Sequence, residues 1–286
     1  MLRPFAYEFF RNGLLAATLA GALCGAVGCW VVLRGMSYIG HGLSHAVFGG
    51  FAASSVIGVN VYLGAGVWGF ASALLIGRIG RRRIGSDAAS AVVTTASFAL
   101  GLALVQVFGT PTRNADAALF GNVLGVSGLD IVAVVVVSLA TAAAFFLRYR
   151  ALLFTTFDPE VAEVSGVRTG RIDALLMIVL TLAVLVSMNI MGVILVAAAI
   201  VTPAAAARLL TQSFTTMLGL ATLIGAVAGF VGMNLSYHLD IASGPTIVLT
   251  STAVFAGAYL LDLVRHRRAP RELDRIVELT IADELA

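Results

Sequence analysis

Histidine is the side chain in this sequence best suited to bind a metal ion, and it occurs at only four positions: His41, His45, His238 and His266. His41 and His45 are four residues apart, so on a helix both imidazoles lie on one face and can reach one ion. The same spacing fits two histidines that only hydrogen-bond to backbone carbonyls. The pair is therefore a candidate metal site, and its spacing alone leaves both interpretations open.

A second candidate lies near the C-terminus, in the segment Asn-Leu-Ser-Tyr-His-Leu-Asp at 234–240. Asn234 and His238 are again four residues apart, and Asp240 is close enough in sequence to orient the imidazole. A histidine at the membrane interface beside a loop is the simpler interpretation of His238. Asn234 and His238 nevertheless stay in the set of candidate metal ligands, whereas His266, in a basic segment, is expected to be an ordinary surface residue.

Several kinds of chemistry are excluded by residues that the sequence lacks. No lysine is present, so the chain has neither a Walker A phosphate-binding loop nor a Schiff-base lysine. The patterns G-x-S-x-G and H-E-x-x-H are also missing. We therefore expect no catalytic residues and no permanently bound cofactor. Energy for any transport must come from a partner or from an ion gradient.

The composition is that of a membrane protein. Of 286 residues, 59% are apolar and 12% are charged, and the mean hydropathy is +0.99, whereas a soluble domain carries about 25% charged residues. The apolar residues occur in runs of roughly 18 to 22, the length that crosses about 30 Å of hydrocarbon. The sequence thus predicts an all-α, polytopic integral membrane protein with eight or nine transmembrane helices in a lipid bilayer.

Nine apolar segments are candidates for these helices. The breaks near residue 61 and near Asn189 are so short that the segments beside them must form tight hairpins or be partly re-entrant. The predicted spans are about 13–33, 44–60, 62–78, 88–108, 129–147, 172–189, 191–207, 215–238 and 245–264.

The orientation follows from the arginines, because basic residues in short loops are retained in the cytoplasm. Fifteen of the eighteen arginines lie in breaks that can share one side of the membrane. The other three are Arg3, Arg11 and Arg113. With nine spans the N-terminus is then outside and the C-terminus inside; eight spans with an inside N-terminus stay open if one early segment fails to cross. This clustering is a matter of topology and does not indicate nucleic-acid binding. We predict a transmembrane domain over 1–264 and a cytoplasmic tail over 265–286.

The longest cytoplasmic break, about 157–171, contains the sequence Phe-Asp-Pro-Glu-Val-Ala-Glu-Val-Ser-Gly. Asp158 can cap a helix that has Pro159 at its first position and Glu160 in its first turn, and Gly166 can end it. A short cytoplasmic helix between two spans is therefore expected from local chemistry. Apolar and acidic residues alternate over 272–285, so an amphipathic helix is expected in the tail.

Four stretches resemble, in order and spacing, the zinc/manganese/iron permease family of ABC importers. The resemblance covers nearly the whole chain. The stretches are VVLRGMSYIGHGLSHAVFGG at 31–50, FDPEVAEVSGV at 157–167, MGVILVAAAIVTPAAAARLL at 191–210 and LSYHLDIASGPTIVL at 235–249.

The resemblance implies a homodimeric permease in the bacterial cell membrane, with a metal path at the subunit interface. It also implies cytoplasmic ABC ATPase subunits and an extracytoplasmic metal-binding protein as partners. The coupling segment of the family corresponds to residues 158–166 and includes Asp158, Pro159, Glu160, Glu163 and Gly166.

The family's metal-path motif Asp-x-x-x-His corresponds to His41 and His45, so histidine stands here where the family has aspartate. Imidazole suits zinc better than manganese. The transported ion is therefore expected to be zinc or manganese, with zinc slightly favoured.

Two other functions remain open on the sequence. An ion-gradient-driven secondary metal carrier would need acidic residues inside the spans, and none is clearly central. A non-transporting membrane scaffold would leave the capped loop at 158–166 without a purpose.

Overall fold

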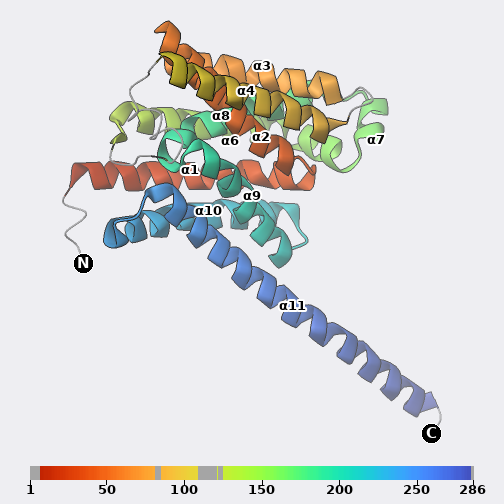
Figure 1. Ribbon diagram of the computed structural model, residues 1–286. Helices are drawn as coiled ribbons and strands as arrows, with labels where there is room; N and C mark the ends of the chain where they lie inside the picture. Colours follow the sequence, from red (N-terminus) through yellow and green to blue (C-terminus); the bar gives the residue numbers. More distant parts are fainter. Residues whose placement is uncertain (1–6, 81–84, 109–120, 122–124, 285–286) are drawn as a thin grey trace.

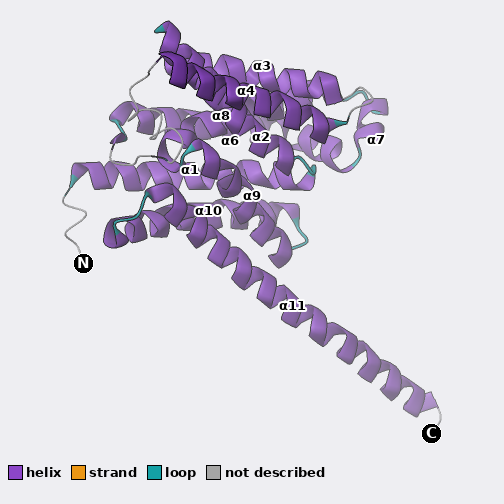
Figure 2. Cartoon of the chain, viewed as in Figure 1, coloured by secondary structure: helices purple, strands orange, loops and turns teal. Residues whose placement is uncertain are grey.

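The computed structural model describes residues 7–80, 85–108, 121 and 125–284, and of 86 and 266–284 it describes the backbone only. The described part contains helices and no strands (Figure 2). The helices are α1 (Glu8–Leu33), α2 (Ser37–Ile57), α3 (Val61–Gly80), α4 (Ser86–Phe108), α6 (Gly128–Phe157), α7 (Pro159–Val164), α8 (Thr169–Met191), α9 (Val193–Leu210), α10 (Phe214–Leu239) and α11 (Ser243–Glu284).

Helix α1 forms the centre of the bundle. The helices α6, α8, α9 and α10 pack directly on it, whereas α3 and α4 lie on the far side of α2 and α11 projects outward from the opposite side (Figure 1). The fully buried side chain of Trp30 packs between Phe145 of α6 and Phe214 of α10, with ring centres 5.5 and 4.6 Å away. The C-terminal half of α1 is buried on nearly every side, as expected for a helix segment that is apolar all round.

Glycines bring the backbones of α1 and α10 into contact. A Cβ atom at Gly21 would lie 2.2 Å from the carbonyl oxygen of Gly225, and one at Gly225 would lie 2.1 Å from the carbonyl oxygen of Gly21. One turn further along, the same holds between Gly25 and Ala221, and between Gly229 and Ala17. Small residues four apart are the usual means by which membrane helices approach closely, because dispersion contacts must replace the hydrophobic effect.

One end of the bundle is joined by a buried arginine. Arg34, directly after α1, forms an ion pair of 2.6 Å with Asp173 at the start of α8, and its Nε donates a hydrogen bond of 2.9 Å to Thr156 at the end of α6. We call these three residues the Arg34 layer. It fixes the C-terminal end of α1 beside the short helix α7, which lies between α6 and α8.

A second polar group joins the opposite end. The Tyr62 hydroxyl, at the start of α3, donates to the carboxylate of Asp130 at the start of α6 and accepts from the amide of Asn189 at the end of α8. We call these residues the Tyr62 layer. Asp130 also accepts bonds from the backbone and side chain of Ser127, which caps α6. The three side chains of this partly exposed layer thus join the ends of α3, α6 and α8 through direct hydrogen bonds.

The chain passes between the two layers nine times within the described residues. Eight helices are long and apolar enough to cross a membrane, and the exception is α2. It is 21 residues long, begins three residues after Arg34 and ends four residues before Val61 of α3. Helix α2 must therefore run from the Arg34 layer to the Tyr62 layer, and its polar composition is tolerated because α3, α4, α8 and α9 pack around it.

The predicted spans are confirmed as helices, with differences at their ends. Helix α2 begins at Ser37 rather than near residue 44, because the chain turns sharply at Gly35, whose φ of 64° ends α1. Helix α6 continues about ten residues beyond the predicted end, to Phe157. The two short breaks are tight turns, and at the second Gly192 alone separates α8 from α9.

The C-terminal part of the chain is one continuous helix. Helix α11 begins near the Tyr62 layer, where the Ser243 hydroxyl donates to the carbonyl of Ile190. Its apolar part ends at Arg265, and the helix continues through the predicted tail to Glu284. Most of the break between the predicted spans 88–108 and 129–147 lies outside the described residues.

The α1–α10 contact predicts a sharp difference between two glycines of the same helix. In Gly225→Ala the new methyl group overlaps the Gly21 backbone, so the helices must separate, at a cost of about 1–3 kcal/mol. In Gly219→Ala the methyl group meets nothing within 4 Å, and alanine is the better helix former. Thermal unfolding of the detergent-solubilised protein should show a lowered midpoint for Gly225→Ala only; equal midpoints would contradict the close contact.

Candidate functional site

His41 and His45 lie in the first three turns of α2, close to the Arg34 layer. Their ring centres are 4.8 Å apart, with the rings nearly perpendicular. His41 is exposed on the surface of the single chain, and His45 is half-buried. The Nδ1 atom of His45 is buried and has no hydrogen-bond partner. This nitrogen therefore gives no support to the interpretation in which both histidines only hydrogen-bond to backbone carbonyls.

Helix α4 fixes the position of the pair. The His45 ring packs edge-on against Phe98 of α4, with ring centres 4.8 Å apart. Gly42 and Gly49, on the same side of α2, leave no room for a Cβ against the side chains and backbone of Ser90, Thr94 and Ser97. The close approach of the two helices brings the aromatic ring within reach of the imidazole.

The separation of the two rings is compatible with one ion shared between them. Two imidazoles bound to one tetrahedral ion, with bonds of about 2.0–2.1 Å, have ring centres about 5 Å apart. The observed separation is close to this value. No group of three or more His, Cys, Asp or Glu side chains able to hold a metal occurs among the described residues. A single chain thus offers a sparse, open site of the kind that suits transient binding.

His238 and Asn234 lie at the other end of the bundle. Tyr237, beside His238, packs against Phe10 in the first turn of α1, with ring centres 5.1 Å apart, whereas His41 follows the last turn of α1. That helix of 26 residues is about 39 Å long. The Asn234 amide donates to the carbonyl of Phe230, four residues earlier in the same helix. The structure does not bring these two candidates to the His41–His45 pair.

Helix α7 has the caps that its sequence predicts. The Asp158 side chain accepts a hydrogen bond of 3.0 Å from the Val161 backbone, and Pro159 occupies the first position. At the other end Gly166 has a φ of 85°, and the backbone bonds of Gly166 and Val167 close the turn. Ala162 faces inward, so Glu160, Glu163 and Val164 are exposed, Val164 at 91%. The helix presents a mixed acidic and apolar outer surface.

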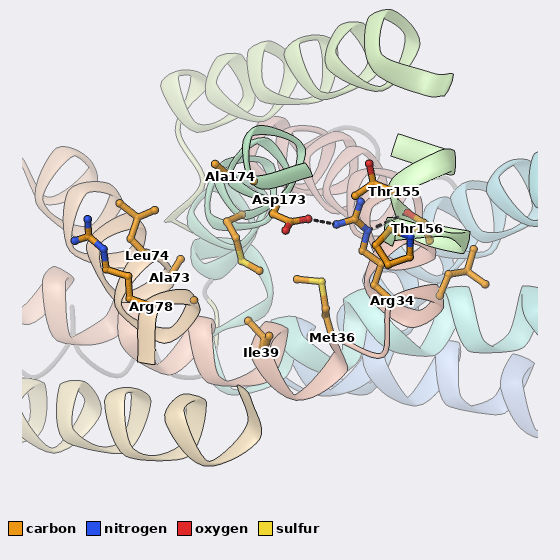
Figure 3. Close-up of a pocket in the computed structure, with 15 residues that line it drawn as sticks. Arg34, Met36, Ile39, Ala73, Leu74, Arg78, Thr155, Thr156, Asp173 and Ala174 are labelled. Carbon is orange, nitrogen blue, oxygen red and sulfur yellow. Dashed lines mark hydrogen bonds and ion pairs between the residues drawn. The ribbon is translucent and has the colours of Figure 1, made fainter. Parts of the chain in front are cut away.

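A cavity of about 700 Å³ lies between α7, α3 and the start of α2 (Figure 3). The Arg34 layer forms one wall, and Arg78 of α3 lies across from it. Sequence analysis identified neither the Arg34 layer nor the Tyr62 layer. Asp130, Asp173 and Asn189 lie close to span ends, where a polar residue is ordinary, and their partners are more than fifty residues away in sequence.

Comparisons with known proteins agree with these features. The model of the ABC 3 transport family matches residues 6–262. The manganese transport system membrane protein MntC of Halalkalibacterium halodurans is 36% identical over 271 residues, which cover 93% of each chain. The manganese import system permease protein ScaB of Streptococcus parasanguinis is 38% identical, over 89% of this chain and 91% of that protein.

A solved structure has the same fold. It is that of PsaBC from Streptococcus pneumoniae in complex with Fab, which matches with a TM-score of 0.82 and 35% identity over 88% of this chain and 91% of the other. The matched family spans the whole apolar part of the chain, α2 and α7 included. This chain is therefore a metal-importer permease of the ABC 3 transport family, a multi-pass protein of the bacterial plasma membrane.

Proposed function

We propose that the chain is the permease of an ATP-driven manganese importer. The observation that carries the proposal is the identity of 36–38%, over about nine tenths of each chain, to permeases named for manganese. The preference for zinc, which rested on histidine at position 41, receives no support from these relatives. The family assignment also favours an ABC permease over an ion-gradient-driven carrier or a scaffold.

The His41–His45 pair supports a path for manganese through weak binding. Among divalent first-row metals, manganese binds nitrogen ligands least tightly and zinc far more tightly. A transport path must bind its ion well enough to replace part of the hydration shell and loosely enough to release it. Two imidazoles meet this requirement for manganese, and they would retain zinc. Selection of manganese is then assigned to an extracytoplasmic binding protein, which delivers the ion.

The exposed position of His41 supports a second copy of the chain as the other wall of the path. One imidazole of each pair is open to a neighbour, and a homodimer would place two pairs beside one route. Neither His238 nor Asn234 belongs to this part of the path; at the Tyr62 end they are candidates only for the place where the ion enters.

The outer surface of α7 supports docking of an ATPase subunit. Its exposed acidic and apolar side chains have no partner among the described residues, and its two caps make it a rigid projection. We therefore place α7 and the Arg34 layer in the cytoplasm, and the Tyr62 layer outside. Because the chain passes nine times between the two layers, this assignment places the N-terminus outside.

The metal path predicts distinct outcomes for three variants. His41→Ala and His45→Ala should each lower ATP-dependent manganese uptake by about tenfold or more, as loss of a ligand environment commonly does. His41→Asp, which introduces the carboxylate found in the family motif, should keep manganese uptake and weaken inhibition by zinc, since oxygen ligands hold zinc less selectively. Uptake into proteoliposomes containing the assembled transporter measures all three. Parental uptake by both alanine variants would show that the pair is structural.

The docking surface predicts uncoupling when its charge is reversed. Glu160→Arg with Glu163→Arg should reduce co-purification of the ATPase and remove uptake, because the acidic face of α7 becomes basic. Asp87→Arg, an exposed acidic residue near the same end of α4, is the matched control and should keep both. Normal co-purification and transport in the double variant would refute docking at α7.

The orientation predicts which sites react with a membrane-impermeant thiol reagent. Val59→Cys, in the turn before α3, should react in intact cells, whereas Ser165→Cys, after α7, should react only in permeabilised cells. Both positions are exposed, and the native Cys24 and Cys29 are buried, so background labelling should be low. The reverse pattern would place α7 outside and overturn the docking proposal with it.

A further inference from the structure

We propose that Arg34 transmits movement of α7 to the histidine-bearing helix α2. The inference rests on the proposed function, in which α7 receives the ATPase and the histidines contact the ion. It assigns to Arg34 a positioning role in transport.

The contacts of Arg34 join the two helices that flank α7. Thr156 lies three residues before Pro159, and Asp173 lies nine residues after Val164. One guanidinium holds both, through Nε to the Thr156 hydroxyl and through Nη1 to the Asp173 carboxylate. A displacement of α7 moves the ends of α6 and α8, on which it packs, and so moves the guanidinium.

The link from Arg34 to the histidines is short and stiff. Gly35, with a φ of 64°, and Met36 donate backbone bonds to Val32 and Val31, which closes the end of α1 in a tight capping turn. Helix α2 begins at the next residue, Ser37, and His41 follows within about one turn. No flexible segment separates the Arg34 guanidinium from the His41–His45 pair, so a shift of the turn displaces the start of α2.

The energetics of the ion pair suggest a purpose other than stability. The Arg34 side chain is only 9% exposed, whereas Asp173 is 43% exposed, so the pair is partly screened by solvent. The Nη2 atom of Arg34 is buried and has no hydrogen-bond partner. A buried charge with an unmade bond costs free energy, and buried ion pairs often stabilise a fold no better than apolar residues would.

The space beside the ion pair leaves room for movement. The cavity of about 700 Å³ borders Arg34, Asp173 and Met36, so on that side the turn between α1 and α2 is not held by close packing. The alternative route is the direct packing of α8 against α2. The two routes make different predictions, because only one of them needs the guanidinium.

The test compares Arg34→Gln with Arg78→Gln in the reconstituted permease–ATPase complex. Arg78 lines the same cavity and has no ion pair among the side chains that the structure describes. In Arg34→Gln, ATP hydrolysis should stay near the parental rate while manganese uptake falls by about tenfold, which is within the range for a residue that carries coupling. Arg78→Gln should change neither quantity. Arg34→Lys should give an intermediate uptake, because an ammonium group keeps the ion pair without the planar fork.

A distance measurement separates transmission from a merely structural role. Spin labels at Tyr38 of α2 and at Ser165, directly after α7, both exposed, report whether the helices move together. On nucleotide binding their distance should stay constant in the parent and change in Arg34→Gln. If Arg34→Gln does not assemble, Thr156→Val takes its place and should show the same change in distance with a smaller loss of uptake. This variant removes no charge; it removes the hydroxyl that accepts from Arg34 and donates to the Leu152 carbonyl.

The outcomes distinguish this proposal from the function on which it rests. Parental uptake and a parental distance response in Arg34→Gln, or in Thr156→Val where that variant is used, would overturn the role of Arg34 and favour the α8–α2 route. Absence of ATP-dependent metal uptake in the parent complex would instead refute the proposed function.

Discussion

The close backbone contact between α1 and α10 is the interaction on which the other elements depend. Lipid offers no hydrophobic gain when two apolar helices meet, so the contact area that glycine permits must supply the attraction. With α10 in place, α1 is surrounded by neighbours, and its last residues reach the Arg34 layer. Helix α1, which carries no candidate ligand, thereby determines where α2 begins, and α2 carries two.

Most polar side chains of the bundle are satisfied either by another helix or by a carbonyl of their own helix. The Arg34 and Tyr62 layers each join three separate parts of the chain through charged or strongly polar groups. Between them, serine and threonine hydroxyls mostly bond the carbonyl four residues earlier in their own helix, as at Thr94 and Thr181. Among the described residues, His45 Nδ1 departs from this rule together with a few other buried atoms, such as Trp30 Nε1 and Ser90 Oγ; of these, only the imidazole nitrogen is a good metal ligand.

Features encoded by neighbouring residues could be predicted from the sequence. The apolar runs gave the spans, and Asp158, Pro159 and Gly166 gave α7 with both of its caps, because each cap depends on residues within one turn. The four-residue spacing of His41 and His45 gave their shared face. The ends of α2 and α6 were less accurate, because tertiary packing lets a helix begin before, or continue beyond, its apolar stretch.

Features that depend on distant parts of the chain could not be predicted in this way. Arg34 and Asp173 are 139 residues apart, and either one alone is typical of a membrane boundary. The same is true of Phe98, which positions the His45 ring from another helix. The spacing of Asn234 and His238 matches that of His41 and His45, yet only the fold shows that a whole helix length separates the two sets.

The low apolarity of α2 has a consequence for how the protein is made. A segment with two histidines and several glycines and serines gains little free energy when it passes by itself from water into lipid. It is therefore a poor candidate for independent entry into the bilayer during synthesis. Its favourable surroundings are supplied by α3 and α4, which emerge from the ribosome later. We expect α2 to enter the bilayer only when those two helices have arrived, so that the helix with the candidate ligands inserts after α3 and α4 although it precedes them in the sequence.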